Sequence, residues 1–156
     1  MNQEEQNFQK FVDRHKATIY SVCYMYATGR DEADDIFQEV LINLWNGLRT
    51  FRGDSSERSW VYRVSLNTCI SYKRKKRLST VPLDIAPEVF EPETPIGRQT
   101  EMLHARISRL EPVDRALVLL WLENMSYEEI GAIIGMPAKN VGVRLVRIKE
   151  KLKGMN

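Results

Sequence analysis

The chain has 156 residues, which is enough for one domain or two small ones. With 43% hydrophobic and 28% charged residues it has a globular composition, and no apolar run reaches the ~18 residues that a membrane span needs. The formal net charge is only +2, so total charge does not indicate nucleic-acid binding, but the charges are segregated along the chain. The N-terminus is polar and acidic, unlike a signal peptide, and we expect a cytoplasmic protein without membrane insertion.

The few residues suited to metal or redox chemistry are scattered. Cys23 and Cys69 stand far apart within apolar patterns and are predicted to be reduced core residues, with a disulfide between them as the less favoured alternative. His15 and His104 form no ligand cluster. No metal site, cofactor or catalytic residue is therefore expected.

Two helices are predicted in the first third of the chain, over residues 8–27 and 31–48, with Gly29 ending the first. The second has the strongest 3.6-residue apolar pattern in the sequence, and it holds five acids and no Lys or Arg. Its polar side carries Asp35, Gln38, Glu39, Ile42, Asn43 and Asn46. This side is either a solvated acidic face or a docking face for a basic partner. A Mg²⁺ site of Asp34, Asp35 and Glu39 would need more inward-facing carboxylates than the spacing gives.

A basic helix is predicted next, after a polar loop over residues 51–58, with Ser59 as its cap. From Ser59 to Leu78 there are six positive charges and no acid. Three aromatic residues are interleaved with them: Trp60, Tyr62 and Tyr72. Aromatic side chains beside Lys and Arg suit single-stranded DNA, because bases stack and phosphates need countercharge. The basic run is interpreted as DNA-binding rather than as a helix end facing its own dipole, whereas Trp60 is equally consistent with a core position.

Residues 79–97 differ in kind, with four of the six prolines, four acids and no base. They are predicted to be a flexible linker. The expected fold is therefore all-α, with two small helical domains at residues 1–78 and 98–156. In the second domain, helices are predicted over residues 98–109 and 113–123.

The C-terminal end is predicted to form a helix-turn-helix. Ser126 and Glu129 make a capping box, Gly135 can take a left-handed turn, and Pro137 suits the start of the last helix. Gly131 is small where a second helix would pack closely.

The last helix has an apolar stripe at Val141, Leu145, Ile148 and Leu152, and six Lys or Arg against one Glu from Lys139 to Lys153. Opposite the stripe lies the predicted groove-facing set of Lys139, Val143, Val146, Arg147 and Glu150. Asn140 and Arg144 lie nearer the flanks and are predicted to hold phosphates. The alternatives are a solvated basic face, and a packing role for the two valines.

Three motifs, in order, resemble the signatures of the extracytoplasmic-function (group IV) sigma factors of the sigma-70 superfamily. The first is Asp34–Glu39 with Leu44 and Trp45. The second is Phe51–Gly53 with Ser59–Val64 and Asn67. The third is formed by residues 110–115, 125–131 and 141–152. The similarity spans nearly the whole chain.

The resemblance implies an alternative sigma factor that directs promoter recognition and transcription initiation and has no chemistry of its own. The residues implied for docking on the clamp helices of core RNA polymerase are Asp35, Gln38, Glu39 and Asn43. Those implied for the single-stranded −10 element are Arg58, Trp60, Arg63, Asn67, Lys73 and Arg74. For the duplex −35 element the resemblance implies only that the last helix enters the major groove. The residues predicted to contact this element, from their positions on that helix, are Lys139, Asn140, Val143, Arg144, Val146 and Arg147. An anti-sigma factor is a further expected partner.

The sequence also departs from this family. Family members usually have Ala where this chain has Gly131. Gly142 and Val143 stand at positions that usually face DNA, so the family's base contacts do not transfer. One rival hypothesis is a stand-alone helix-turn-helix regulator, which explains only the C-terminal half. The other is a nuclease, which rests only on the acidic cluster of the second helix.

Overall fold

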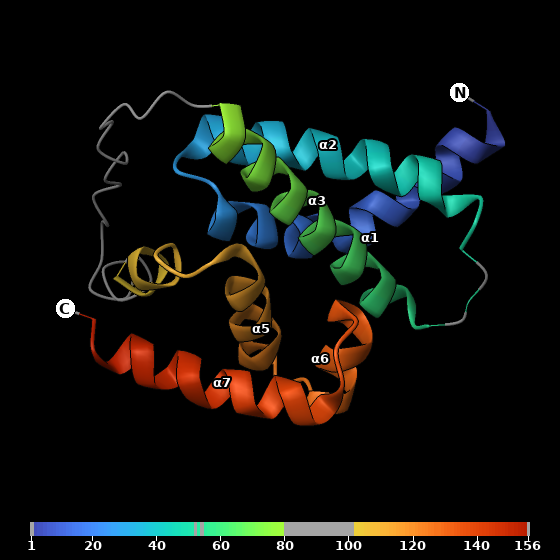
Figure 1. Ribbon diagram of the computed structural model, residues 1–156. Coiled ribbons are helices and arrows are strands. Elements are labelled where there is room, and N and C mark those ends of the chain that lie inside the picture. The colour runs from blue at the N-terminus through green and yellow to red at the C-terminus, as the bar shows by residue number, and fades with distance from the viewer. Residues whose placement is uncertain (1, 52, 54, 80–101, 156) are drawn as a thin grey trace. The chain divides into compact units, whose positions relative to one another are not determined.

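The computed structural model describes residues 2–51, 53, 55–79 and 102–155, and every regular element within them is a helix (Figure 1). The helices are α1 (Gln3–Tyr26), α2 (Arg30–Leu48), α3 (Glu57–Ser79), α5 (Pro112–Leu122), α6 (Tyr127–Ile134) and α7 (Ala138–Lys153), and residues 102–107 are also helical. Contacts divide the chain into two units, Met1–Leu83 and Asp84–Asn156. The all-α prediction is confirmed. The predicted linker lies outside the described residues except for Ser79, which ends α3.

The N-terminal unit is a bundle in which each of α1, α2 and α3 packs on the other two. Its buried centre includes Ile19 and Val22 of α1, Ile36, Val40 and Leu44 of α2, and Val61 and Leu66 of α3. These side chains recur at helical spacing on each element, so the three apolar faces meet. The bundle thereby turns the opposite faces of α2 and α3 toward solvent.

The start of α1 and the boundary between α1 and α2 both differ from the prediction. The α1 helix begins at Gln3 because the Asn2 side chain accepts a hydrogen bond from the Glu5 N–H, at 2.8 Å. Helix α1 ends at Tyr26, and Gly29 is the N-cap of α2 instead of the stop of α1. A cap made by a single polar side chain is a weaker sequence signal than an apolar stripe. The sequence therefore predicts the start of this helix at residue 8, five residues after its start in the structure.

The two cysteines are free and fully buried, one on α1 and one on α3. A hydrogen bond with Cys23, together with burial, raises the pKa of the Cys69 thiol. This pair is part of the core, as predicted.

The C-terminal unit packs α5, α6 and α7 against one another around Leu117, Leu120, Ile130 and Leu145. The predicted capping box is confirmed, because Ser126 Oγ accepts from the Glu129 N–H at 3.1 Å. The predicted turn is also confirmed, with Gly135 in the left-handed region at φ 86°. A short helix, a glycine turn and a long basic helix thus form a helix-turn-helix.

The structural reason for a glycine at position 131 differs from the one predicted. A Cβ at this position would stand 2.3 Å from the backbone carbonyl oxygen of Met136. That oxygen belongs to the turn and cannot move without changing the path from α6 to α7. In this conformation of the turn, glycine therefore fits where an alanine would not, and the close contact comes from the turn backbone rather than from the packing of a second helix.

Candidate functional site

The outer face of α2 is acidic, as predicted. Asp35, Gln38 and Glu39 are exposed, whereas Ile36 and Val40 between them are fully buried. Ile42 is also exposed on this face and adds an apolar side chain that suits a protein partner better than solvent. The face can therefore be altered without disturbing the core.

Glu32 is the one acid among the five that does not belong to this face. Its side chain is only 7% exposed and accepts hydrogen bonds from the Thr28 N–H at 3.0 Å and from Lys73 Nζ of α3 at 2.5 Å. Lys73 is itself only 15% exposed. The contact of Lys73 with −10 DNA stays a prediction, and the structure gives its ammonium group a partner that joins α3 to α2.

A groove of about 600 Å³ runs between α2 and α3. It is lined by Glu39, Ile42, Asn43, Val64, Asn67, Thr68, Ser71, Tyr72 and Lys75. Asn43 Nδ2 donates to Thr68 Oγ1 at 2.8 Å, so Asn43 helps to hold the two helices together. The groove brings two predicted polymerase-docking residues, Glu39 and Asn43, next to the predicted −10 residue Asn67.

Trp60 belongs to an aromatic cluster at the end of the N-terminal unit. Its ring stacks on Phe51 at 4.7 Å between centroids and meets Phe11 edge-on at 5.8 Å. The side chain is nevertheless only half-buried. Trp60 therefore packs against the protein through part of its surface and keeps another part accessible, which accommodates both interpretations of the sequence.

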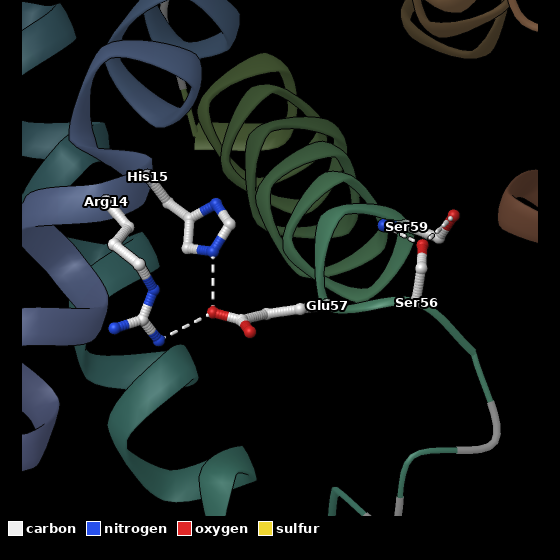
Figure 2. Close-up of polar contacts among 5 residues, drawn as sticks. All are labelled: Arg14, His15, Ser56, Glu57 and Ser59. Carbon is white, nitrogen blue, oxygen red and sulfur yellow. Dashed lines mark hydrogen bonds and ion pairs between the residues drawn. The ribbon is translucent and has the colours of Figure 1, made fainter.

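The start of α3 corrects two predictions. Ser56, not Ser59, is the capping residue, because the Ser59 N–H donates to Ser56 Oγ at 3.0 Å (Figure 2). Arg58 consequently lies inside α3 and not in the preceding loop. It is exposed, with its guanidinium 5.6 Å from the centre of the Tyr62 ring. Where several serines lie close together before a helix, the sequence pattern alone does not show which of them is the N-cap.

Glu57 fastens this end of α3 to α1. Its Oε1 atom accepts from Arg14 Nη2 at 2.8 Å and lies 2.7 Å from His15 Nε2 (Figure 2). The hydrogen bonds from Arg14 and His15 hold the pKa of the Glu57 carboxyl below its ordinary value of 4.5. This contact joins the first turn of α3 to α1, and no sequence pattern indicated it because its members are 42 and 43 residues apart.

We expect Glu57→Gln to reduce stability at neutral pH by less than about 1 kcal/mol, because the ion pair is partly exposed. A carboxyl whose pKa is lower in the folded state stabilises the fold above its unfolded pKa, near 4.5, and that contribution is lost as pH falls through the folded value. Urea unfolding at neutral pH and below pH 4.5 should thus show a smaller acid-induced loss in the variant. Asp13→Asn, at an acid whose nearest cation is 3.8 Å away, is the matched control. Equal losses in all three proteins would rule out the contribution.

The exposed face of α7 lies opposite its buried stripe of Val141, Leu145 and Ile148. All of the predicted groove-facing residues are exposed: Lys139, Val143, Val146, Arg147 and Glu150. Val143 is 47% and Val146 is 59% exposed, so neither valine is packed away against α5 or α6. This exposure favours the groove-facing assignment over the alternative in which the two valines pack against neighbouring helices, and their contact with DNA stays a prediction.

Arg144 and Gly142 have partners that the sequence did not indicate. Arg144 Nη2 lies 2.9 Å from Asp114 Oδ1 of α5. The Arg144 guanidinium therefore already forms an ion pair within the protein and is not reserved for DNA. Gly142 lies beneath the ring of Tyr127, the first residue of α6. Asn140 is exposed, and its predicted phosphate contact stays a prediction.

Within the described stretches, no helix is both long and apolar enough to cross a membrane. Those same residues contain no group of three or more His, Cys, Asp or Glu side chains placed to hold a metal ion. Asp34, Asp35 and Glu39 instead project from the outer side of α2 into solvent. The described surface carries charged side chains, exposed apolar side chains and a groove. These are features of a surface that binds a partner.

Comparison with known families assigns both units. The family described as Sigma-70 region 2 matches residues 11–78, and that described as Sigma-70, region 4 matches residues 100–152. Together they cover well over half of the chain. The first match spans the acidic α2 face and the basic α3 helix, and the second spans the helix-turn-helix.

Curated proteins align along almost all of the chain. The ECF RNA polymerase sigma-E factor of Escherichia coli is 29% identical over 96% of this chain and 86% of its own length. The protein of the same name from Haemophilus influenzae is 26% identical over 96% and 87%. The ECF RNA polymerase sigma factor SigW of Bacillus subtilis is 25% identical over 96% and 89%.

Solved structures support the same fold. The sigma factor RpoE of Bartonella quintana, in complex with the anti-sigma factor NepR, has a TM-score of 0.78 at 19% identity, covering 95% of each chain. CnrH in complex with the cytosolic domain of CnrY has a TM-score of 0.68 at 21% identity, covering 96% of this chain and 86% of CnrH.

Proposed function

This chain belongs to the extracytoplasmic-function sigma factors of the sigma-70 superfamily, and we propose how its surfaces bind core RNA polymerase and promoter DNA as an alternative sigma factor. It acts in the cytoplasm by binding and positioning, without catalysis or a cofactor. The observation that carries the proposal is the separation of two faces of opposite character, an acidic one on α2 and a basic one on α7. Each stands opposite the buried stripe of its own helix.

The acidic face of α2 is proposed to dock on a basic surface of core polymerase, through Asp35, Gln38, Glu39 and Asn43. Charge complementarity accelerates association and rejects wrong partners. Exposed Ile42, one helical turn beyond Gln38 and Glu39, adds apolar area to this polar set.

The outer side of α3 and the loop before it are proposed to hold the −10 element as a single strand. Trp60, half-buried, can stack a base on its accessible part. Arg58 precedes Trp60 in α3, Arg63, Asn67 and Arg74 follow it, and all four are exposed. Lys73, paired with Glu32, contributes by fixing α3 on α2.

The exposed face of α7 is proposed to enter the major groove at the −35 element. Arg147 can bind a guanine through two hydrogen bonds, and the methyl groups of Val143 and Val146 can pack on thymine methyls. Lys139 and Asn140 lie near the N-terminal end of α7, where phosphate contacts fix its register. Arg144 can add to these contacts from its place beside Asp114.

An anti-sigma protein is proposed as a regulatory partner, because the similar RpoE of Bartonella quintana is bound to one. The alternative of a stand-alone helix-turn-helix regulator does not explain why residues 11–78 match Sigma-70 region 2.

Transcription with purified core polymerase over a promoter library tests the proposal. The chain should direct initiation at a defined subset of promoters that share −35 and −10 sequences, and core polymerase alone should not. Co-purification with core polymerase separates a sigma factor from a stand-alone regulator. A chain that binds promoter duplex without binding core polymerase would refute the assignment.

The recognition helix gives a prediction about specificity. Arg147→Ala should relax base preference at one position of the −35 element by about 1–3 kcal/mol, since a bidentate guanine contact is lost. Val143→Ser should weaken thymine selection at another position. Sequencing of −35 variants selected by each holoenzyme measures both effects. Lys151→Ala, at an exposed lysine in the last turn of α7, is the control and should leave every preference unaltered. If neither Arg147 nor Val143 variant changes base preference, the groove assignment fails.

A further inference from the structure

Gly142 in the recognition helix leaves room for an aromatic side chain from the preceding helix, and we call this space the seat of the Tyr127 ring. A Cβ at Gly142 would meet ring carbons Cε2 and Cδ2 of Tyr127 at 3.1 and 3.3 Å. Any larger residue at this position would therefore push the ring aside. The ring occupies the space that a side chain of α7 would otherwise fill.

This seat lies at one edge of the exposed face of α7. Residues three and four apart on a helix are neighbours, so Lys139 and Val146 flank position 142. Both are exposed. The ring of Tyr127 therefore continues the proposed DNA-facing surface of α7 with a side chain that comes from α6.

The Tyr127 hydroxyl is available for a partner outside the protein. The residue is 38% exposed, and within the stretches that the structure describes its hydroxyl has no hydrogen-bond partner. In a docked helix-turn-helix, the recognition helix enters the groove while the helix before it crosses the DNA backbone. A side chain from the start of α6, lying beside the N-terminal half of α7, is thus on the side from which a backbone phosphate can be reached.

We propose that Tyr127 is a DNA-positioning residue, whose hydroxyl donates a hydrogen bond to a backbone phosphate beside the −35 element while Gly142 holds its ring in place. The inference rests on the proposed function and adds a residue outside the set that the sequence predicted. The phenol carries no charge, so it releases no counterion, and its contribution differs in salt dependence from that of Lys or Arg.

Binding of the holoenzyme to duplex promoters tests this contact, using −35 variants selected with the wild-type chain. Tyr127→Phe should weaken binding about 3- to 10-fold, the factor that one ordinary hydrogen bond contributes. The loss should be equal on all −35 variants, with the salt dependence unchanged. Tyr20→Phe, at an exposed tyrosine of α1, is the matched control and should bind like wild type.

The seat is tested by a second substitution. Gly142→Leu should displace the ring, so that adding Tyr127→Phe in that background changes affinity less than 2-fold, because coupled residues lose additivity. An equal effect of Tyr127→Phe in both backgrounds would overturn the role of Gly142. Unchanged affinity in Tyr127→Phe alone, or a change confined to one base pair, would overturn the phosphate contact. These failures differ from failure of the proposed function, in which the wild-type chain would itself bind neither core polymerase nor promoter.

Discussion

Lys73→Met should destabilise the N-terminal unit by about 3 kcal/mol, although the sequence places Lys73 in a basic run that is interpreted as DNA-binding. The substitution leaves the Glu32 carboxylate, 7% exposed, without the ammonium group that neutralises it. Breaking a buried ion pair on one side costs about 3–5 kcal/mol, and the residual exposure of both groups places this pair at the lower end. Urea unfolding of the full chain in a Trp121→Phe background measures the effect, because the two remaining tryptophans, Trp45 and Trp60, both lie in this unit.

The neighbouring cations provide the control for this prediction. Arg74 and Lys75 are exposed, and Arg74→Met or Lys75→Met should change stability by less than about 0.5 kcal/mol. Combining Lys73→Met with Glu32→Gln should recover part of the loss, since the buried negative charge that lost the Lys73 ammonium group is then removed as well. Equal stability of the Lys73 and Arg74 variants would show that the ion pair does not stabilise the fold, and DNA contact would then be the remaining role proposed for Lys73.

The same distinction changes how promoter opening should be tested. Replacing Lys73 together with its neighbours would mix loss of fold with loss of DNA contact. Arg74→Ala with Lys75→Ala isolates the second effect, because neither side chain is buried. Fewer phosphate contacts should flatten the salt dependence of opening.

The elements that the sequence predicted best are those defined by a repeated local pattern. Helices α2 and α7 each bury one stripe at 3.6-residue spacing, so the sequence alone indicates both the helix and its outward face. The capping box at Ser126 and the turn at Gly135 were also predictable, because each depends on residues within four positions of one another.

What the sequence could not predict depends on residues that are distant along the chain. Glu32 and Lys73 are 41 residues apart, and an acid in the first turn of a helix is more often explained by the helix dipole. In the sequence Gly142 is only a position without a side chain to contact DNA, whereas in the structure the Tyr127 ring lies against it. Such pairs form only when the tertiary packing brings two helices together, and local spacing carries no information about them.

Reversing the acidic face of α2 should have the largest effect on function. Asp35→Lys with Glu39→Lys places two cations against the basic polymerase surface that we propose as its partner. Like charges brought together across an interface cost several kcal/mol, so affinity for core polymerase should fall on the order of 100-fold, or about 3 kcal/mol. Fluorescence titration of labelled chain with core polymerase measures the loss, which should shrink as salt screens the repulsion.

The fold should survive this change, because Asp35 and Glu39 are exposed while Ile36 and Val40 beside them carry the packing. An unaltered unfolding midpoint in urea would establish that. Glu5→Lys with Asp13→Lys makes the same change in net charge on the exposed side of α1, and it should weaken binding far less. If both double variants lost affinity equally, net charge and not this face would govern association. If neither lost affinity, the docking surface would have to be sought on another face of the bundle.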